Sequence, residues 1–208
     1  MLLTSRHESA KVVAPSEAKM PSHGMEWLWQ QLRDVRRPLI LDCGPLRQTT
    51  LDVLLRRGVK LCVADIVSPL QRNNPKFWDK TKKVPVFLTE TLLEQIPKIE
   101  TGSQDAVFCW HLLDLIPPEA VAPVVERLFA YLKPGGILFA LLRQPYLADG
   151  LETVCWLEDL ICIHTDSNGK KPFAYPVVNN REIEKLLPAG GVKIFLTRSG
   201  RREVVALR

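Results

Sequence analysis

The sequence predicts an α/β fold, in which a mostly parallel sheet is covered by helices on both faces. Short apolar runs alternate with amphipathic stretches four times between residues 38 and 142. Units of this length require parallel strands joined by helical crossovers. The last two apolar runs, 192–198 and 202–208, are separated by a short Ser-Gly turn and therefore predict an antiparallel hairpin at the edge of the sheet.

The individual elements follow from the spacing of the apolar residues. Five continuous runs, bounded by Pro, Gly or polar residues, predict strands buried on both faces: 38–42, 59–66, 84–88, 105–110 and 137–142. Apolar residues at helical spacing predict the helices: 25–37, 49–58, 91–99, 118–132 and 181–191. Residues 67–83 are polar and predict a loop with about one helical turn.

A single domain accounts for the length and composition. The chain has 208 residues, of which 46% are hydrophobic and 25% charged. This is enough for one full core and too little for two ordinary domains. Residues 1–24 are polar and without periodicity, so we expect a flexible N-terminal arm, followed by one domain over residues 25–208.

The cysteines and the apolar runs bear on the compartment. The five cysteines show no CxxC spacing, which favours buried thiols in a reducing compartment over disulfides or a metal site. No run approaches the roughly 20 apolar residues of a membrane helix, and the N-terminus does not resemble a secretory signal. We therefore expect a cytoplasmic protein with no membrane partner and no metal; the sequence does not predict the oligomeric state.

The charge pattern leaves two interpretations of the surface. The chain carries 28 Lys and Arg against 23 Asp and Glu, a net charge of +5, spread over short clusters. Such clusters favour solvated helix ends and turns, because no basic helix or aromatic-interleaved stripe accompanies them. The alternative is a shallow field that attracts an anionic partner such as RNA, although the sequence contains no nucleic-acid module.

Several strings resemble the class I S-adenosylmethionine-dependent methyltransferases over residues 38–208. The most typical is ERLFAYLKPGGILFALL at 126–142, in which a helix, Lys-Pro-Gly-Gly and an apolar strand follow one another. The resemblance implies a Rossmann-like three-layer sandwich whose seven-stranded sheet has its last strand inserted antiparallel. It also implies S-adenosyl-L-methionine as the cofactor and methyl transfer to an acceptor, which we expect to be a small molecule.

The first family motif is only partly present. In LDCG, residues 41–44, the acid Asp42 ends a strand and Gly44 begins the turn that would pass beneath the cofactor. The second family glycine is replaced by Leu46, which adds a side chain where glycine permits close approach. Pro45 removes an N–H donor and fixes φ. The glycine-rich motif is therefore degenerate.

A second acid ends the next predicted strand, in VADI at 63–66. Asp65 follows Asp42 by 23 residues, close to the spacing of about 20 in dinucleotide folds. The resemblance implies that its carboxylate accepts hydrogen bonds from both ribose hydroxyls. The alternative is an acid that caps the loop at this edge. We expect both acids to face one crevice.

The third segment, DAVFCWHLLDLIPPEAV at 105–121, supplies the catalytic candidate. His111 could orient a substrate hydroxyl or act as a base, because its ordinary pKa lies near neutrality; the alternative is a turn residue packed against the loop.

The resemblance also implies that residues 145–180 form an insertion on the substrate side. Trp156, Phe173 and Tyr175 would cover the substrate or belong to the core. The resemblance implies these cofactor-binding residues: Asp42, Cys43, Gly44, Asp65, Ile66, Leu88, Cys109 and Trp110.

Two other function classes compete with an active methyltransferase. A dehydrogenase would need G-x-G-x-x-G to bring backbone N–H groups to a pyrophosphate, and LDCGPLRQ lacks it. The second alternative is a methyltransferase-like pseudoenzyme, a binding or scaffolding module without catalysis. The missing glycines favour that alternative, whereas retention of both Asp42 and Asp65 favours cofactor binding, because packing requires neither acid.

Overall fold

The computed structural model describes residues 20–144, 154–165, 174–187, 191–197 and 200–208. Six strands form the central sheet, in the order β10-β11-β7-β6-β2-β3. Their bounds are β2 Leu39–Asp42, β3 Lys60–Val63, β6 Gln104–Trp110, β7 Leu132–Arg143, β10 Val192–Leu196 and β11 Arg201–Leu207. Parallel pairing joins β3, β2, β6 and β7, whereas β11 is antiparallel to both β7 and β10. The α/β class and the C-terminal hairpin are confirmed, and the last strand is inserted as the resemblance implies.

The prediction of a seven-stranded sheet is wrong at one edge. Only Val86–Phe87 of the expected strand 84–88 is extended, as β5, and it pairs with β4, Trp78–Asp79, in a separate hairpin. Val84 and Val86 are 70% and 41% exposed, and only Phe87 is buried. A sheet strand needs both faces covered, and Pro85 lacks an N–H for the ladder. Among the described residues, β3 is therefore the last strand on this side.

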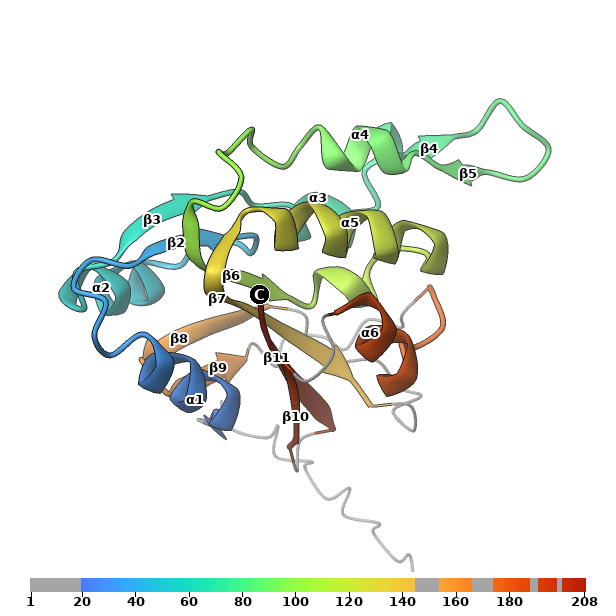
Figure 1. Ribbon diagram of the computed structural model, residues 1–208. Helices are drawn as coiled ribbons and strands as arrows, with labels where there is room; N and C mark the ends of the chain where they lie inside the picture. Colours follow the sequence, from blue (N-terminus) through green and yellow to red (C-terminus); the bar gives the residue numbers. More distant parts are fainter. Residues whose placement is uncertain (1–19, 145–153, 166–173, 188–190, 198–199) are drawn as a thin grey trace, which may run out of the picture.

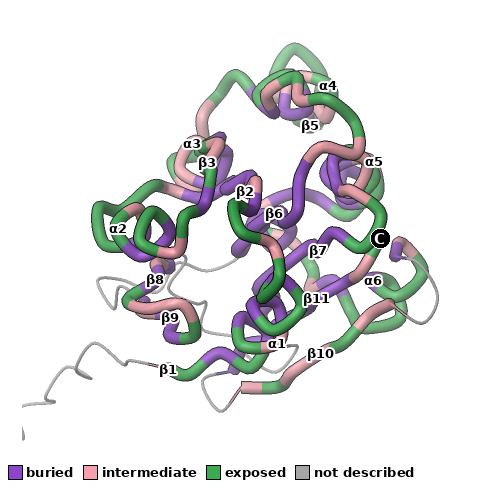
Figure 2. Tube along the Cα trace, turned by 60° about the vertical axis from the view of Figure 1, so that its left-hand side comes forward, coloured by how far each residue is buried: buried purple, intermediate pink, exposed green. Residues whose placement is uncertain are grey.

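Helices cover both faces of the sheet (Figure 1). Their bounds are α1 His23–Gln31, α2 Gln48–Arg56, α3 Val67–Gln71, α4 Thr89–Leu93, α5 Pro118–Ala130 and α6 Asn180–Leu186. Side chains of α1 and α2 share one core cluster with Phe108 and Trp110 of β6. Side chains of α3, α4, α5 and α6 share the other cluster with Val107 and Cys109 of the same strand. The alternation along β6 is that of a strand buried on both faces, and Figure 2 shows β6 as buried.

A small three-stranded sheet adds to the α1–α2 face. It has the order β1-β9-β8, with β1 Met20–Pro21, β8 Cys155–Asp159 and β9 Cys162–Thr165. The main-chain N–H of Leu157 in β8 donates to Thr50 Oγ1 of α2 at 3.0 Å. Part of the expected insertion 145–180 is thus a hairpin packed beside α2. Residues 1–19 of the expected arm lie outside the described residues, and α1 already begins at His23.

The thiols match the expectation from the sequence. All five cysteines are free, and only Cys62 is more than slightly exposed, as the prediction of buried thiols requires. None of the helices within the described ranges has the length and hydropathy of a membrane span.

Arg202 ties the C-terminal hairpin to the rest of the fold. Its side chain is 2% exposed, and Nε and Nη2 donate to the carbonyl of Arg143 at 3.1 and 2.9 Å. It also donates to the Val178 carbonyl and to the Asn180 amide oxygen. One guanidinium therefore satisfies the end of β7 and the start of α6 together.

Replacing Arg202 by Met should lower the free energy of unfolding by about 2–4 kcal/mol, because two buried carbonyl groups lose their donors. Urea denaturation followed by circular dichroism measures the change. Arg181→Met is the matched control, because Arg181 is exposed nearby; it should shift stability by less than about 0.5 kcal/mol. Equal effects of the two substitutions would contradict the anchoring role.

Candidate functional site

The carboxyl ends of the parallel strands gather several of the predicted residues. Main-chain hydrogen bonds join these ends: Cys43 N donates to Phe108 O at 2.9 Å, Ala64 N to Asp42 O at 2.7 Å and Ile66 N to Cys43 O at 3.0 Å. The residues that follow β2, β3 and β6 therefore lie at one edge. Ligands of open α/β sheets bind at this kind of edge.

Asp42 is the central group of this edge. Its side chain is 1% exposed, and Oδ1 accepts hydrogen bonds from Gly44 N at 2.9 Å and from Trp110 Nε1 at 2.6 Å. Burial raises the pKa of Asp42 to about 7, while the two hydrogen bonds oppose the rise. The charge of Asp65 raises the same pKa further. The two acids thus lie within electrostatic reach of one another.

Asp65 differs from Asp42 in being exposed to solvent. Its Oδ1 accepts a hydrogen bond from Ser68 N at 2.9 Å, at the start of α3. This is the capping role that the sequence left open beside ribose binding. An exposed carboxylate that uses Oδ1 as a cap retains Oδ2 for a ligand hydroxyl.

Trp110, rather than Leu46, covers the turn after β2. A Cβ atom on Gly44 would lie 2.4 Å from Trp110 Cδ1, so only glycine fits beneath the indole. The ring also packs edge-on against Phe108 and Phe139. Leu46 is 41% exposed, and the three atoms nearest to a Cβ on Gly44 all belong to Trp110. The indole therefore occupies the space directly over Gly44.

The backbone of Trp110 is strained. Its φ is 47°, a left-handed value that is an outlier for a bulky side chain. Such strain is of the order of 1–3 kcal/mol and persists only where surrounding contacts impose it. Here the contacts are the hydrogen bond to Asp42 and the two aromatic rings.

The other predicted cofactor-binding residues lie deeper. Cys43, Cys109 and Ile66 are buried in the cluster with α3 and α5. Burial raises the pKa of the Cys109 thiol to about 12 and that of Cys43 well above its ordinary value, so both stay protonated and unreactive. Leu88 is half-buried before α4, and its N–H donates to Phe77 O. Cys43 and Ile66 take part in the edge through main-chain hydrogen bonds. The side chains of Cys43, Ile66 and Cys109 are buried in the core and do not face the edge.

His111 is enclosed in a polar cluster beneath the same edge. It is fully buried, with Nδ1 3.3 Å from Asp114 Oδ2. Asp114 Oδ2 also accepts from Arg143 N at 2.8 Å. Burial lowers the pKa of His111, but the nearby Cys155 thiol and Asp114 outweigh it and raise the pKa to about 9. Asp114 therefore fixes the orientation of the imidazole and favours its protonated form.

The sequence did not point to Arg143 and Cys155 as members of this cluster. Arg143 directly follows the apolar run 137–142. A charged residue at the end of a predicted buried strand could have indicated that Arg143 belongs to the site. Nothing in the spacing of Cys155 indicated that it would meet His111. The expected aromatic cover is not assembled among the described residues: Trp156 stacks on His164, Tyr175 stacks on Trp78, and Phe173 lies outside them.

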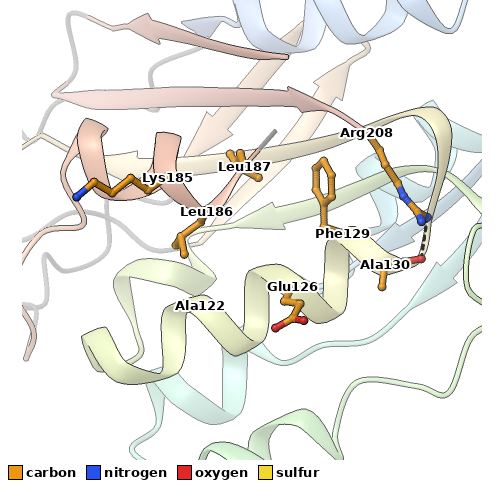
Figure 3. Close-up of a pocket in the computed structure, with 8 residues that line it drawn as sticks. All are labelled: Ala122, Glu126, Phe129, Ala130, Lys185, Leu186, Leu187 and Arg208. Carbon is orange, nitrogen blue, oxygen red and sulfur yellow. Dashed lines mark hydrogen bonds between the residues drawn. The ribbon is translucent and has the colours of Figure 1, made fainter. Parts of the chain in front are cut away.

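A hollow of about 540 Å³ lies elsewhere, between α5 and α6 (Figure 3). It is lined by Ala122, Glu126, Phe129, Ala130, Lys185, Leu186, Leu187 and Arg208. Arg208 at its end donates to the Ala130 carbonyl at 3.0 Å and is already bound there. None of the predicted site residues reaches this hollow. Within the described residues, no group of three or more His, Cys, Asp or Glu could hold a metal ion.

Comparison with known proteins gives fold likeness only. No family model matches the chain, and no curated protein matches it. Among solved structures, it is similar to the Burkholderia thailandensis 1,6-didemethyltoxoflavin-N1-methyltransferase with bound S-adenosylhomocysteine, at 16% identity over 89% of this chain and 76% of that one, with a TM-score of 0.48. S-adenosylmethionine-dependent methyltransferases from Methanosarcina mazei and Archaeoglobus fulgidus are similar at 15% and 16% identity, with TM-scores of 0.45 and 0.44. The alignments cover 83% and 88% of this chain and 93% and 94% of those chains. At these values the description of the fold rests on the strand order above.

The raised pKa of Asp42 predicts a pH dependence of stability. The unfolded state loses this proton near the ordinary value of 3.8 and the folded state near 7, so the folded state binds more protons in between. The contribution of Asp42 therefore makes the free energy of unfolding fall as pH rises from 4 to 7. In Asp42→Asn the amide oxygen still accepts both hydrogen bonds but does not titrate. The difference in unfolding free energy, variant minus wild type, should increase by on the order of 4 kcal/mol between pH 4 and pH 8.

Urea denaturation at several pH values measures this difference. Asp79→Asn is the control, because Asp79 is exposed and forms a local turn. A constant difference between wild type and Asp42→Asn across this range would show that Asp42 titrates at its ordinary pKa.

Proposed function

We propose that the protein is an S-adenosylmethionine-dependent methyltransferase that binds its cofactor at the carboxyl edge of β2, β3 and β6. The observation that carries this proposal is the pair of strand-terminal acids. Asp42 is buried beside Gly44, and Asp65 is exposed near enough to raise its pKa. Packing alone does not require a buried carboxylate, whose desolvation is unfavourable. A ligand with a ribose and an ammonium group suits such a pair.

Each residue has a distinct role in this proposal. Asp65 accepts hydrogen bonds from the ribose hydroxyls, and Asp42 orients the turn at which the amino-acid end of the cofactor binds. Leu88, half-buried before α4, supplies apolar surface beside the adenine, whereas Ile66 contributes only its main chain. When bound, the cofactor supplies a methyl group already activated on sulfur, so the protein mainly has to align the acceptor with it. His111, held by Asp114, positions the loop after β6; its role as a base stays a prediction, as does a small-molecule acceptor.

The fit of the cofactor differs between the two ends of this edge. At Asp65 the site is exposed and suits a ribose. At Gly44 the Trp110 indole occupies the space over the main chain. Binding of the amino-acid end therefore requires the indole to move, which breaks its hydrogen bond to Asp42 and relieves the strained φ. The same contact would suit the alternative, a binding module without catalysis, if the indole never moves.

Asp65→Asn should weaken binding of S-adenosylhomocysteine about ten- to hundredfold. The amide still caps α3 through its oxygen but loses the charge that strengthens hydrogen bonds from hydroxyls, an effect of about 1.5–3 kcal/mol. Isothermal titration calorimetry gives the affinities. The matched control is Asp79→Asn, which alters another exposed, turn-forming carboxylate and should leave affinity unchanged. An affinity that Asp65→Asn does not alter would remove Asp65 from the site.

Trp110→Ala should tighten binding of the same ligand about tenfold or more, because no charged hydrogen bond has to be broken before the ligand enters. Phe108→Leu loosens the same aromatic cluster without uncovering Gly44, and it should not tighten binding. If neither wild type nor Trp110→Ala binds S-adenosylmethionine or S-adenosylhomocysteine at millimolar concentration, the methyltransferase proposal fails and the binding module takes its place. Weaker binding by Trp110→Ala would instead make the indole part of the ligand site.

A further inference from the structure

The segment expected to complete the sheet forms a projecting hairpin. Residues 80–85 connect β4 to β5, and Figure 1 shows this connection extending away from the body beyond α4. Every residue from 80 to 86 is exposed. We call residues 78–87 the basic hairpin, because Lys80, Lys82 and Lys83 lie at its tip. The chain thus exposes a hairpin in place of an internal strand.

The root of the basic hairpin is firmly packed. Phe77, just before β4, is 1% exposed, and Phe87 is 7% exposed. Trp78 packs edge-on against Phe87 at 5.3 Å between ring centroids and stacks on Tyr175 at 6.4 Å. Asp79 accepts hydrogen bonds from the N–H and the hydroxyl of Thr81. The tip is therefore held out from the body by a fixed base.

The basic hairpin carries a local excess of positive charge. Residues 78–87 contain three lysines and one acid, Asp79, a net charge of +2, and two more basic residues, Arg72 and Lys76, come shortly before them. None of the three tip lysines forms an ion pair within the described part of the chain. The hydrogen bonds from Thr81 lower the pKa of Asp79, and Lys82 lowers it further. One carboxylate faces three lysines, so the tip keeps an excess of positive charge.

We propose that the basic hairpin binds the phosphodiester backbone of a nucleic acid. Lysine ammonium groups bind phosphates as point charges, without the directional fork of arginine, which suits contacts to a backbone that are independent of sequence. All the basic residues of the tip are lysines. A two-stranded ribbon also has the width that the major groove of B-DNA admits. Val84, 70% exposed among the lysines, supplies an apolar contact for a sugar or base. Binding at this hairpin is independent of the proposed methyl transfer.

Fluorescence anisotropy with labelled 20-nucleotide single-stranded RNA, single-stranded DNA and a 20-base-pair DNA duplex tests the proposal, with no cofactor present. Three lysine–phosphate contacts predict that affinity falls about 20-fold between 50 and 200 mM NaCl for single strands. The triple variant Lys80→Glu/Lys82→Glu/Lys83→Glu should bind at least tenfold more weakly at 50 mM. The triple Gln variant should lose about 2 from the slope of log affinity against log salt.

The matched control reverses three exposed lysines elsewhere, Lys60, Lys98 and Lys185, and so changes the net charge equally. It should retain clearly more affinity than the hairpin variant. Equal losses in the two triple variants would overturn the proposal, because they would show a general charge effect. Binding of polyglutamate but of none of the three nucleic acids would also overturn it and indicate an acidic protein partner. Which of the three probes binds tightest identifies the nucleic acid.

Discussion

The hydrogen bond from Trp110 to Asp42 organises the functional edge of this protein. It joins the end of β6 to the end of β2 through a carboxylate that is almost fully buried. A buried carboxylate must be hydrogen-bonded, so the indole and the N–H of Gly44 are required together. This requirement holds Trp110 at a positive φ and excludes any side chain at Gly44. One interaction thus sets the shape of the turn and closes the space over it.

Periodicity predicted the parts of the fold in which burial is uniform. The runs that became β2, β6 and β7 are apolar along their length because helices cover both faces. The run 84–88 is also mostly apolar, yet it does not join the central sheet. Its valines are exposed and its Phe87 packs on Phe77 and Trp78 of the preceding turn. Packing among these aromatic side chains accompanies the separate hairpin. The spacing of apolar residues in a sequence does not indicate which aromatic side chains will contact one another.

The sequence predicted which residues of the candidate site end strands. It did not predict the contacts that their side chains make with one another. Position at a strand end follows from the sequence, so Asp42 and Asp65 could be placed at one edge. The contacts of His111 with Asp114 and Cys155, and of Asp114 with Arg143, join three separate segments. Such contacts depend on tertiary packing. The role of Trp110 was likewise hidden, because its indole reaches back across the sheet to a residue 68 positions earlier.

The missing glycines after Gly44 have less consequence than the sequence suggested. Among the described non-glycine residues, only Asn73 and Trp110 have positive φ, so Pro45 and Leu46 follow a path open to any residue. Leu46 is 41% exposed, and the Arg47 guanidinium lies over the Trp156 ring of β8 at 5.0 Å. The turn therefore needs glycine only where another group lies against its main chain. That position is Gly44, and the group that lies against it is the Trp110 indole. Whether this edge accepts a ligand thus depends on the mobility of one indole rather than on the number of glycines in the turn.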